Sequence, residues 1–130
     1  MWRTDHAFGV DVPMRLDTVV DQLIGSFRSQ GFLVHVSQME AAMPHSSGAA
    51  HQRFRVLTLL DPAEARSVLE AGGDDFGLIF PIRMIIYESF NHLTRVVVTD
   101  PEKVCQTAGT AYLRPMAHAV GLKLAKVLFE

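Results

Sequence analysis

The sequence predicts a two-layer α+β sandwich, in which helices cover one face of a mixed or antiparallel sheet of about five strands. The first observation is that two strand-like segments, 56–60 and 96–99, each run directly into an Asp-Pro pair and then into a helix-like segment. An aspartate accepts the first backbone N–H groups of a helix, and proline at the first helical position loses no hydrogen bond. The second observation is a pair of strand-like segments joined by a short turn, which must be antiparallel.

The first elements follow from hydrophobic spacing. Residues 8–12 alternate apolar and small or polar side chains, as in a half-buried strand. Residues 18–30 place apolar side chains on one helical face, with Asp17 as the predicted cap and Gly31 supplying the left-handed residue that closes the helix. Residues 32–36 then alternate again, which predicts a second strand.

The second half contains three more strands and three helices. Residues 54–60 predict a strand, and Asp61 with Glu64 forms a capping box for the helix that follows. Residues 78–88 and 93–99 predict two strands joined by a tight turn, and Pro81 suggests an edge or a bulge near the start of the first. A short helix after Pro101 and a longer helix from about residue 115 complete the chain.

Composition limits the classes of function. The 130 residues are enough for one domain, with 48% hydrophobic and 20% charged residues and a net charge of −2. This balance argues against a nucleic-acid-binding protein, which usually carries a basic stripe. No apolar run reaches the length of a membrane span, and the start of the chain lacks the apolar stretch of a signal peptide. The single Cys105 excludes an internal disulfide, so we expect a soluble cytoplasmic protein.

The order of four short motifs resembles a known family. Gly31-Phe32, Asp61-Pro62, Phe80-Pro81-Ile82-Arg83 and Asp100-Pro101 occur in the order and spacing of the bacterial and archaeal domain-of-unknown-function family 302. The resemblance implies a compact α+β sandwich, often dimeric, with no established activity. It covers about residues 8–106 of a single domain 1–130, and residues 110–130 look like a C-terminal helical extension. Where many members carry cysteines beside the two prolines, this chain has Leu60-Asp61 and Ile82.

One face of the predicted sheet is rich in arginine. If Phe54, Val56 and their equivalents on the other strands point inward, strict alternation turns five basic side chains outward among apolar neighbours. These predicted ligand-binding residues are His35, Arg53, Arg55, Arg83 and Arg95. Such a face is typical of a protein interface, here a homodimer, and less often of a small-anion site. The alternative is a solvated face on which arginine stems lie over apolar residues.

Residues 39–51 interrupt the pattern of strands and predict a loop that acts as a lid or contacts a partner. Four of its side chains are potential metal ligands: Met39, Met43, His45 and His51. Thioether and imidazole ligands suit copper(I), which makes a copper- or haem-binding, redox-related protein the alternative function. The plainer interpretation is a polar insertion whose methionines pack on the core.

No catalytic constellation is evident. Cys105 lies near the start of a predicted helix, where a thiol can be activated, but its apolar neighbours favour simple packing. Asp61 and Asp100 are explained as helix caps, and no glycine-rich phosphate loop follows a strand. The sequence therefore predicts a non-enzymatic binding or interaction domain of unknown biochemical role, with no cofactor assigned.

Overall fold

The structure is a computed structural model that describes residues 2–37, 53–70, 80–88, 93–109 and 111–129. Along the chain the elements are β1 (Trp2–Arg3), β2 (Ala7–Val12), α1 (Leu16–Ser29), β3 (Leu33–Val36), β4 (Phe54–Leu60), α3 (Pro62–Glu70), β5 (Ile82–Glu88), β6 (Thr94–Thr99), α4 (Pro101–Ala108), the 3₁₀ helix η3 (Ala111–Leu113) and α5 (Arg114–Phe129). None of the described helices is both long and apolar enough to cross a membrane.

The sheet contains six strands rather than about five, in the order β1-β2-β6-β5-β4-β3, and every neighbouring pair is antiparallel. The additional strand is β1, which pairs Trp2 with Gly9 and Arg3 with Phe8. Two residues are too few to produce a recognisable alternation, so this strand could not be predicted. The edge suggested by Pro81 is wrong, because this residue directly precedes β5, which is an interior strand. The Phe80–Pro81 peptide bond is cis.

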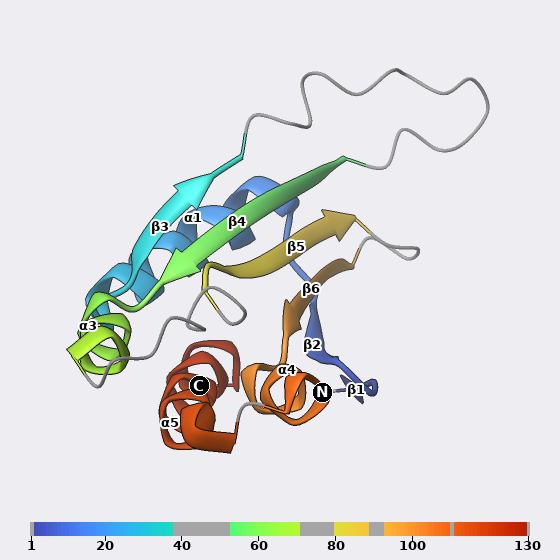
Figure 1. The fold of residues 1–130 in the computed structure, drawn as a ribbon. Helices are drawn as coiled ribbons and strands as arrows, with labels where there is room; N and C mark the ends of the chain where they lie inside the picture. Colours follow the sequence, from blue (N-terminus) through green and yellow to red (C-terminus); the bar gives the residue numbers. More distant parts are fainter. Residues whose placement is uncertain (1, 38–52, 71–79, 89–92, 110, 130) are drawn as a thin grey trace.

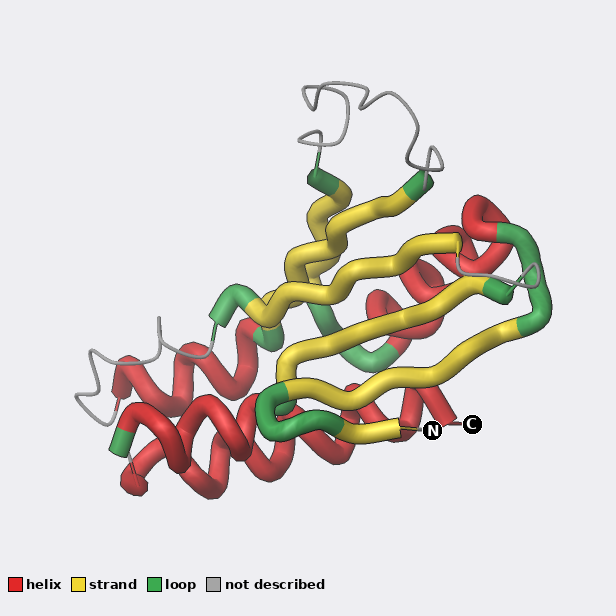
Figure 2. The backbone as a smooth tube through the Cα atoms, turned by 90° about the vertical axis from the view of Figure 1, so that its right-hand side faces the viewer, coloured by secondary structure: helices red, strands yellow, loops and turns green. Residues whose placement is uncertain are grey.

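The helices lie on one side of the sheet, as predicted, and leave the other side open (Figures 1 and 2). The core between the two layers is made of apolar side chains from both. Its largest fully buried members are Leu16, Phe27, Leu57, Leu59, Met84, Ile86, Val96, Val98, Leu113, Val120 and Leu124. We call the uncovered side the open face.

The prediction that Phe54 and Val56 point into the core is wrong, because the inward-facing residues of β4 are shifted by one position. Leu57 and Leu59 are fully buried and pair with the core-facing Met84 and Ile82, whereas Val56 lies on the open face opposite Ile85. The segment carries apolar residues at both phases, so either phase can form a core. The shift places Arg55 on the side of the helices, because it pairs across the sheet with the buried Ile86.

Both Asp-Pro junctions cap helices as predicted. Asp100 accepts a hydrogen bond from the backbone N–H of Glu102 at 3.0 Å, and Asp61 accepts one from that of Glu64 at 3.5 Å. Gly31 closes α1 with a positive φ of 91°, a conformation that favours glycine. The cap predicted at Asp17 is wrong: α1 begins at Leu16, and Asp17 lies in its first turn.

Helix α5 is part of the core and is attached to both helices that follow the Asp-Pro pairs. Its side chains Met116, Ala117, Val120 and Leu124 are buried. The Nζ of Lys123 donates to the buried carboxylate of Asp61 at 2.6 Å. Residues 111–129 therefore complete the same core as the strands.

Candidate functional site

The open face has an apolar row at its centre. Cross-strand pairing aligns Gly9, Val97, Ile85 and Val56 on the four strands β2, β6, β5 and β4. Ile85 is 44% exposed, whereas both of its neighbours along β5, Met84 and Ile86, are completely buried on the other side. The half-buried Val97 and Val56 lie on either side of Ile85, so the three side chains form one contiguous apolar strip, and large contiguous apolar patches mark contact surfaces.

An acidic and aromatic row lies on one side of the apolar row. It runs from Asp11 through Arg95 and Tyr87 to Phe54. Arg95 donates to Asp11 from Nε at 2.8 Å and from Nη2 at 3.1 Å, and its guanidinium lies 5.5 Å from the centroid of the Trp2 ring. The hydrogen bond from Arg95 is the largest cause that lowers the pKa of Asp11 below its ordinary value. The charge of Arg95 is therefore already compensated within the chain.

A polar row lies on the other side of the apolar row. Arg83 on β5, Thr58 on β4 and His35 on β3 are cross-strand neighbours. Arg83 and His35 are exposed, and within the described part of the chain neither side chain has an acidic partner. A guanidinium, a hydroxyl and an imidazole in one row are groups that bind carboxylate or phosphate oxygens.

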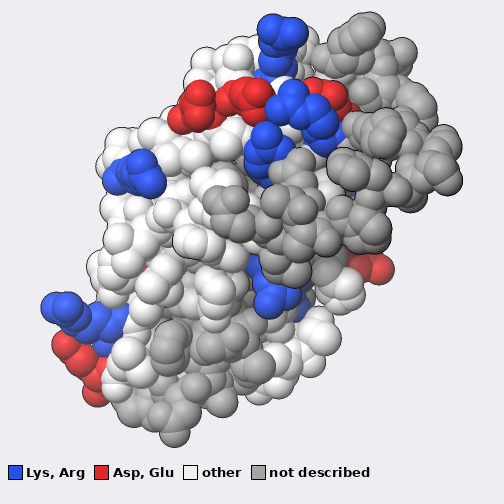
Figure 3. All heavy atoms as spheres, turned by 90° about the horizontal axis from the view of Figure 1, so that it is seen from above, with Lys and Arg blue, Asp and Glu red and all other residues white. Residues whose placement is uncertain are grey.

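Arg53 and Arg55 do not belong to this row. Both pair with Asp17 in the first turn of α1, Arg53 Nη2 at 3.2 Å and Arg55 Nη2 at 3.5 Å. Arg53 also lies 4.0 Å from Glu88. Basic and acidic side chains are intermixed on the end of the molecule seen in Figure 3. Their charges are thus balanced at the edge of the helix layer, away from the open face.

The structure therefore divides the five predicted ligand-binding residues into three groups. Arg83 and His35 share the polar row, Arg95 is neutralised by Asp11, and Arg53 with Arg55 joins α1. The residue that sequence reasoning missed is Thr58, which connects Arg83 to His35 across β4. Thr58 could have been found only by recognising that Leu57 and Leu59, and not Val56, point into the core.

The predicted metal ligands Met39, Met43, His45 and His51 lie outside the described residues. Within the residues that are described, no group of three or more His, Cys, Asp or Glu side chains is arranged to hold a metal ion. Cys105 is 3% exposed in α4 and packs in the core, in agreement with the favoured interpretation of this residue.

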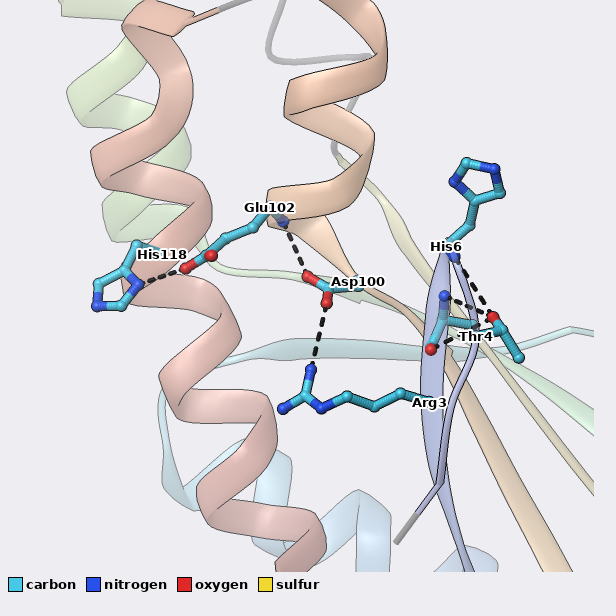
Figure 4. A network of polar contacts seen from close by, with 7 residues as sticks. Arg3, Thr4, His6, Asp100, Glu102 and His118 are labelled. Atoms are coloured by element: carbon cyan, nitrogen blue, oxygen red, sulfur yellow. Dashed lines mark hydrogen bonds and ion pairs between the residues drawn. The ribbon is translucent and has the colours of Figure 1, made fainter.

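A network of acids and bases connects β1, α4 and α5 (Figure 4). Asp100 caps α4 and lies 3.6 Å from Nη1 of Arg3, while Glu102 points toward Nδ1 of His118 on α5 and contacts it. The Thr4 side chain accepts a bond from the backbone of Ala7 at 3.1 Å. Each acid in this network holds one element against another. We therefore assign it a structural role.

Comparisons with known proteins agree with this architecture. A family model described as "Domain of unknown function DUF302" matches residues 8–130, a range that includes α5. A crystal structure of an uncharacterized conserved protein DUF302 from Bacillus stearothermophilus superposes with a TM-score of 0.77 at 21% identity and covers 94% of each chain. At this identity the likeness establishes the fold. The comparison with curated proteins gave no match.

Proposed function

This chain belongs to the DUF302 family of domains of unknown function, and we propose that it is a non-catalytic binding domain that forms a homodimer through its open face. The observation that carries the proposal is the apolar row in which the exposed Ile85 lies between the half-buried Val97 and Val56, with polar side chains on both sides of the row. An apolar centre with a polar rim is the usual composition of a protein interface.

The ion pair of Arg95 with Asp11 lowers the cost of burying the side of the apolar row on which it lies. Arg95 lies 5.5 Å from the Trp2 ring and is the cross-strand partner of Tyr87, and its charge is matched by Asp11. Burying a compensated, hydrogen-bonded pair at the edge of an interface costs far less than burying an isolated charge. The open face can therefore lose its water around Ile85 without leaving an unpaired ion in the apolar centre.

A second copy is the partner that the arrangement of rows fits. A two-fold axis along the apolar row would place Val97, Ile85 and Val56 against the same residues of the other copy. The same rotation would set the polar row of each copy over the other's acidic and aromatic row. Arg83 would then lie over the partner's Tyr87, a cation above an aromatic face.

The size of the face sets the strength that we expect. Strands about 4.8 Å apart with a rise of about 3.3 Å per residue give six short strands a footprint of about 500 Å². A standard stable interface buries about 800 Å² on each partner. We therefore expect association at micromolar concentrations.

Light scattering coupled to size-exclusion chromatography tests the homodimer. The wild-type mass should rise from monomer toward dimer between about 1 and 100 µM, the range in which such interfaces associate. Ile85→Lys should remain monomeric, because dimerisation of this variant would bury an unpaired lysine charge at the centre of the interface. Leu122→Lys is the matched control, since Leu122 is 60% exposed on α5 in the other layer. A wild-type monomer throughout this range would refute the homodimer.

A second function is favoured by the polar row, namely the binding of a small anion. The guanidinium of Arg83 and the imidazole of His35 stand on either side of the Thr58 hydroxyl, with no acid beside them among the described residues. Thermal shift with inorganic phosphate and with succinate tests this function. Arg83→Gln should abolish the shift, whereas Arg66→Gln, on the exposed side of α3, should preserve it.

The alternative of a copper- or haem-binding, redox-related protein depends on residues outside the described part of the chain. Absorption spectra and elemental analysis of the purified protein decide it. Near-stoichiometric copper or iron in the purified protein would favour the redox-related function over the proposed non-catalytic domain. We also infer a cytoplasmic location, because the single cysteine of the sequence is buried and cannot form an internal disulfide.

A further inference from the structure

A groove runs between α3 and the segment in which η3 leads into α5. Its volume is about 260 Å³. The floor is apolar and consists of the buried side chains Val68, Leu113 and Met116. Tyr112, 57% exposed, forms one wall. The groove belongs to the helix layer and is therefore separate from the open face (Figure 1).

Among the described residues that line this groove, only Glu64 carries a carboxylate. The backbone N–H of Glu64 donates to the cap Asp61, but within the described residues its carboxylate has no cationic partner. Glu64 lies in the first turn of α3, at the positive end of the helix dipole. The groove thus presents a negative charge above an apolar floor.

We propose that this groove binds a small organic ammonium ion with an apolar body. The ammonium group would face the Glu64 carboxylate and the ring of Tyr112, both of which attract a cation. The apolar body would cover Val68, Leu113 and Met116. The volume is slightly below the range of about 300–1,000 Å³ for drug-sized ligands, so the ligand class is a compact amine.

Charge and location separate this site from the proposed homodimer. An anion would meet the Glu64 carboxylate, and none of the described lining residues carries a positive charge, so the proposed site selects against acids. Neither Ile85 nor Arg83 contributes to it. A failure of self-association would leave the groove unchanged, and a failure of amine binding would leave the homodimer unchanged.

Nuclear magnetic resonance titration of the full chain tests the proposal with three probes of one shape: phenethylammonium, phenethyl alcohol and hydrocinnamate. The amine should shift the signals of Val68, Leu113 and Met116 and bind more tightly than the alcohol, with no binding of the acid. Glu64→Gln should weaken the amine about tenfold, the loss of one charge-assisted contact, and leave the alcohol unaffected. Glu70→Gln, at the other end of α3, is the control.

A second variant blocks the groove while the carboxylate remains. Ser67 lines the groove and is exposed, so Ser67→Phe adds a ring to the groove without disturbing the core. This variant should lose the binding of both the amine and the alcohol. Equal affinity for the amine and the alcohol, an unchanged amine affinity in Glu64→Gln, or the absence of any shift with the amine would each overturn the proposal.

Discussion

The guanidinium of Arg95 binds the carboxylate of Asp11 through two parallel hydrogen bonds, of 2.8 and 3.1 Å, between residues that are cross-strand partners in β2 and β6. The Trp2 ring lies beside the same guanidinium, at 5.5 Å. One arginine thus connects the interior strand β6 to β2 and to the two-residue strand β1. This relationship makes the amino terminus of the described chain part of the sheet.

The first prediction concerns acid stability. The hydrogen bond from Arg95 lowers the pKa of Asp11, so the ionised carboxylate stabilises the folded state. This contribution is complete above the ordinary aspartate pKa of about 3.9 and is lost as the pH falls through the lower folded value. Urea unfolding should therefore show Asp11→Asn to be less stable than wild type at neutral pH, with a difference that shrinks in strong acid. Asp21→Asn, exposed on α1, should match wild type at both values. A difference independent of pH would contradict the assignment.

The second prediction concerns Gly9. A Cβ atom at this position would lie 2.2 Å from the carbonyl oxygen of Val96 and 2.5 Å from the Trp2 ring. Gly9→Ala should therefore destabilise the protein by about 1–3 kcal/mol, as overpacking does. Gly25→Ala is the matched comparison, because nothing lies within 4 Å of its Cβ on helix α1. It should stabilise by about 0.5–1 kcal/mol, since glycine is unfavourable inside helices. Thermal unfolding of both variants measures the contrast, and equal effects would show that β1 does not pack as described.

The third prediction concerns the contact between α5 and α3. Lys123→Met removes the donor to Asp61, whose side chain is only 3% exposed, and leaves the carboxylate without its charged partner. The free energy of unfolding should fall by about 2 kcal/mol, the value of a hydrogen bond to a charged group. Lys126 is exposed on the next turn of α5, so Lys126→Met should change the free energy of unfolding little. Chemical denaturation decides the matter, and indistinguishable midpoints for the two variants would show that the pair contributes nothing.

The fourth prediction concerns the polar row of the open face. Arg83→Glu should weaken self-association about tenfold, because a carboxylate over the partner's Tyr87 meets the negative face of the ring. Arg66→Glu makes the same charge change on α3 and should leave association unchanged. Sedimentation equilibrium of the two variants gives the dissociation constants. Equal weakening by both would indicate a general effect of net charge and would argue against the two-fold arrangement.

Most of the fold could be predicted because local signals agreed with one another. Asp61 and Asp100 marked the starts of two helices, and Gly31 marked the end of a third. β1 was missed because two residues have no periodicity. The phase of β4 was wrong because the strand is apolar on both sides, and the deciding contact is made by Arg55 with Asp17, nearly forty positions away in the sequence.

The candidate site was only partly predictable for the same reason. Arg83 and His35 lie on the open face, as predicted, because the inner phase assumed for β5 and β3 agrees with the burial of Met84 and with the pairing of Val34 to the buried Leu59. Arg53 and Arg55 were placed on the open face by an inverted β4, and Thr58 was overlooked with them. The groove beside Glu64 forms where α3 contacts η3 and α5. A contact between segments that are distant in the sequence leaves no local pattern from which it could be predicted.

The position of α5 has a consequence for synthesis of the protein. This helix is the last of the described elements, yet it supplies Val120 and Leu124 to the centre of the core and the ammonium group of Lys123 to the buried Asp61. While the chain is still emerging from the ribosome, the strands can pair but their inner surface stays uncovered. The core can close only after residues 114–129 have emerged, so we expect the inner surface of the nascent sheet to need shielding from other apolar surfaces until these residues have left the ribosome.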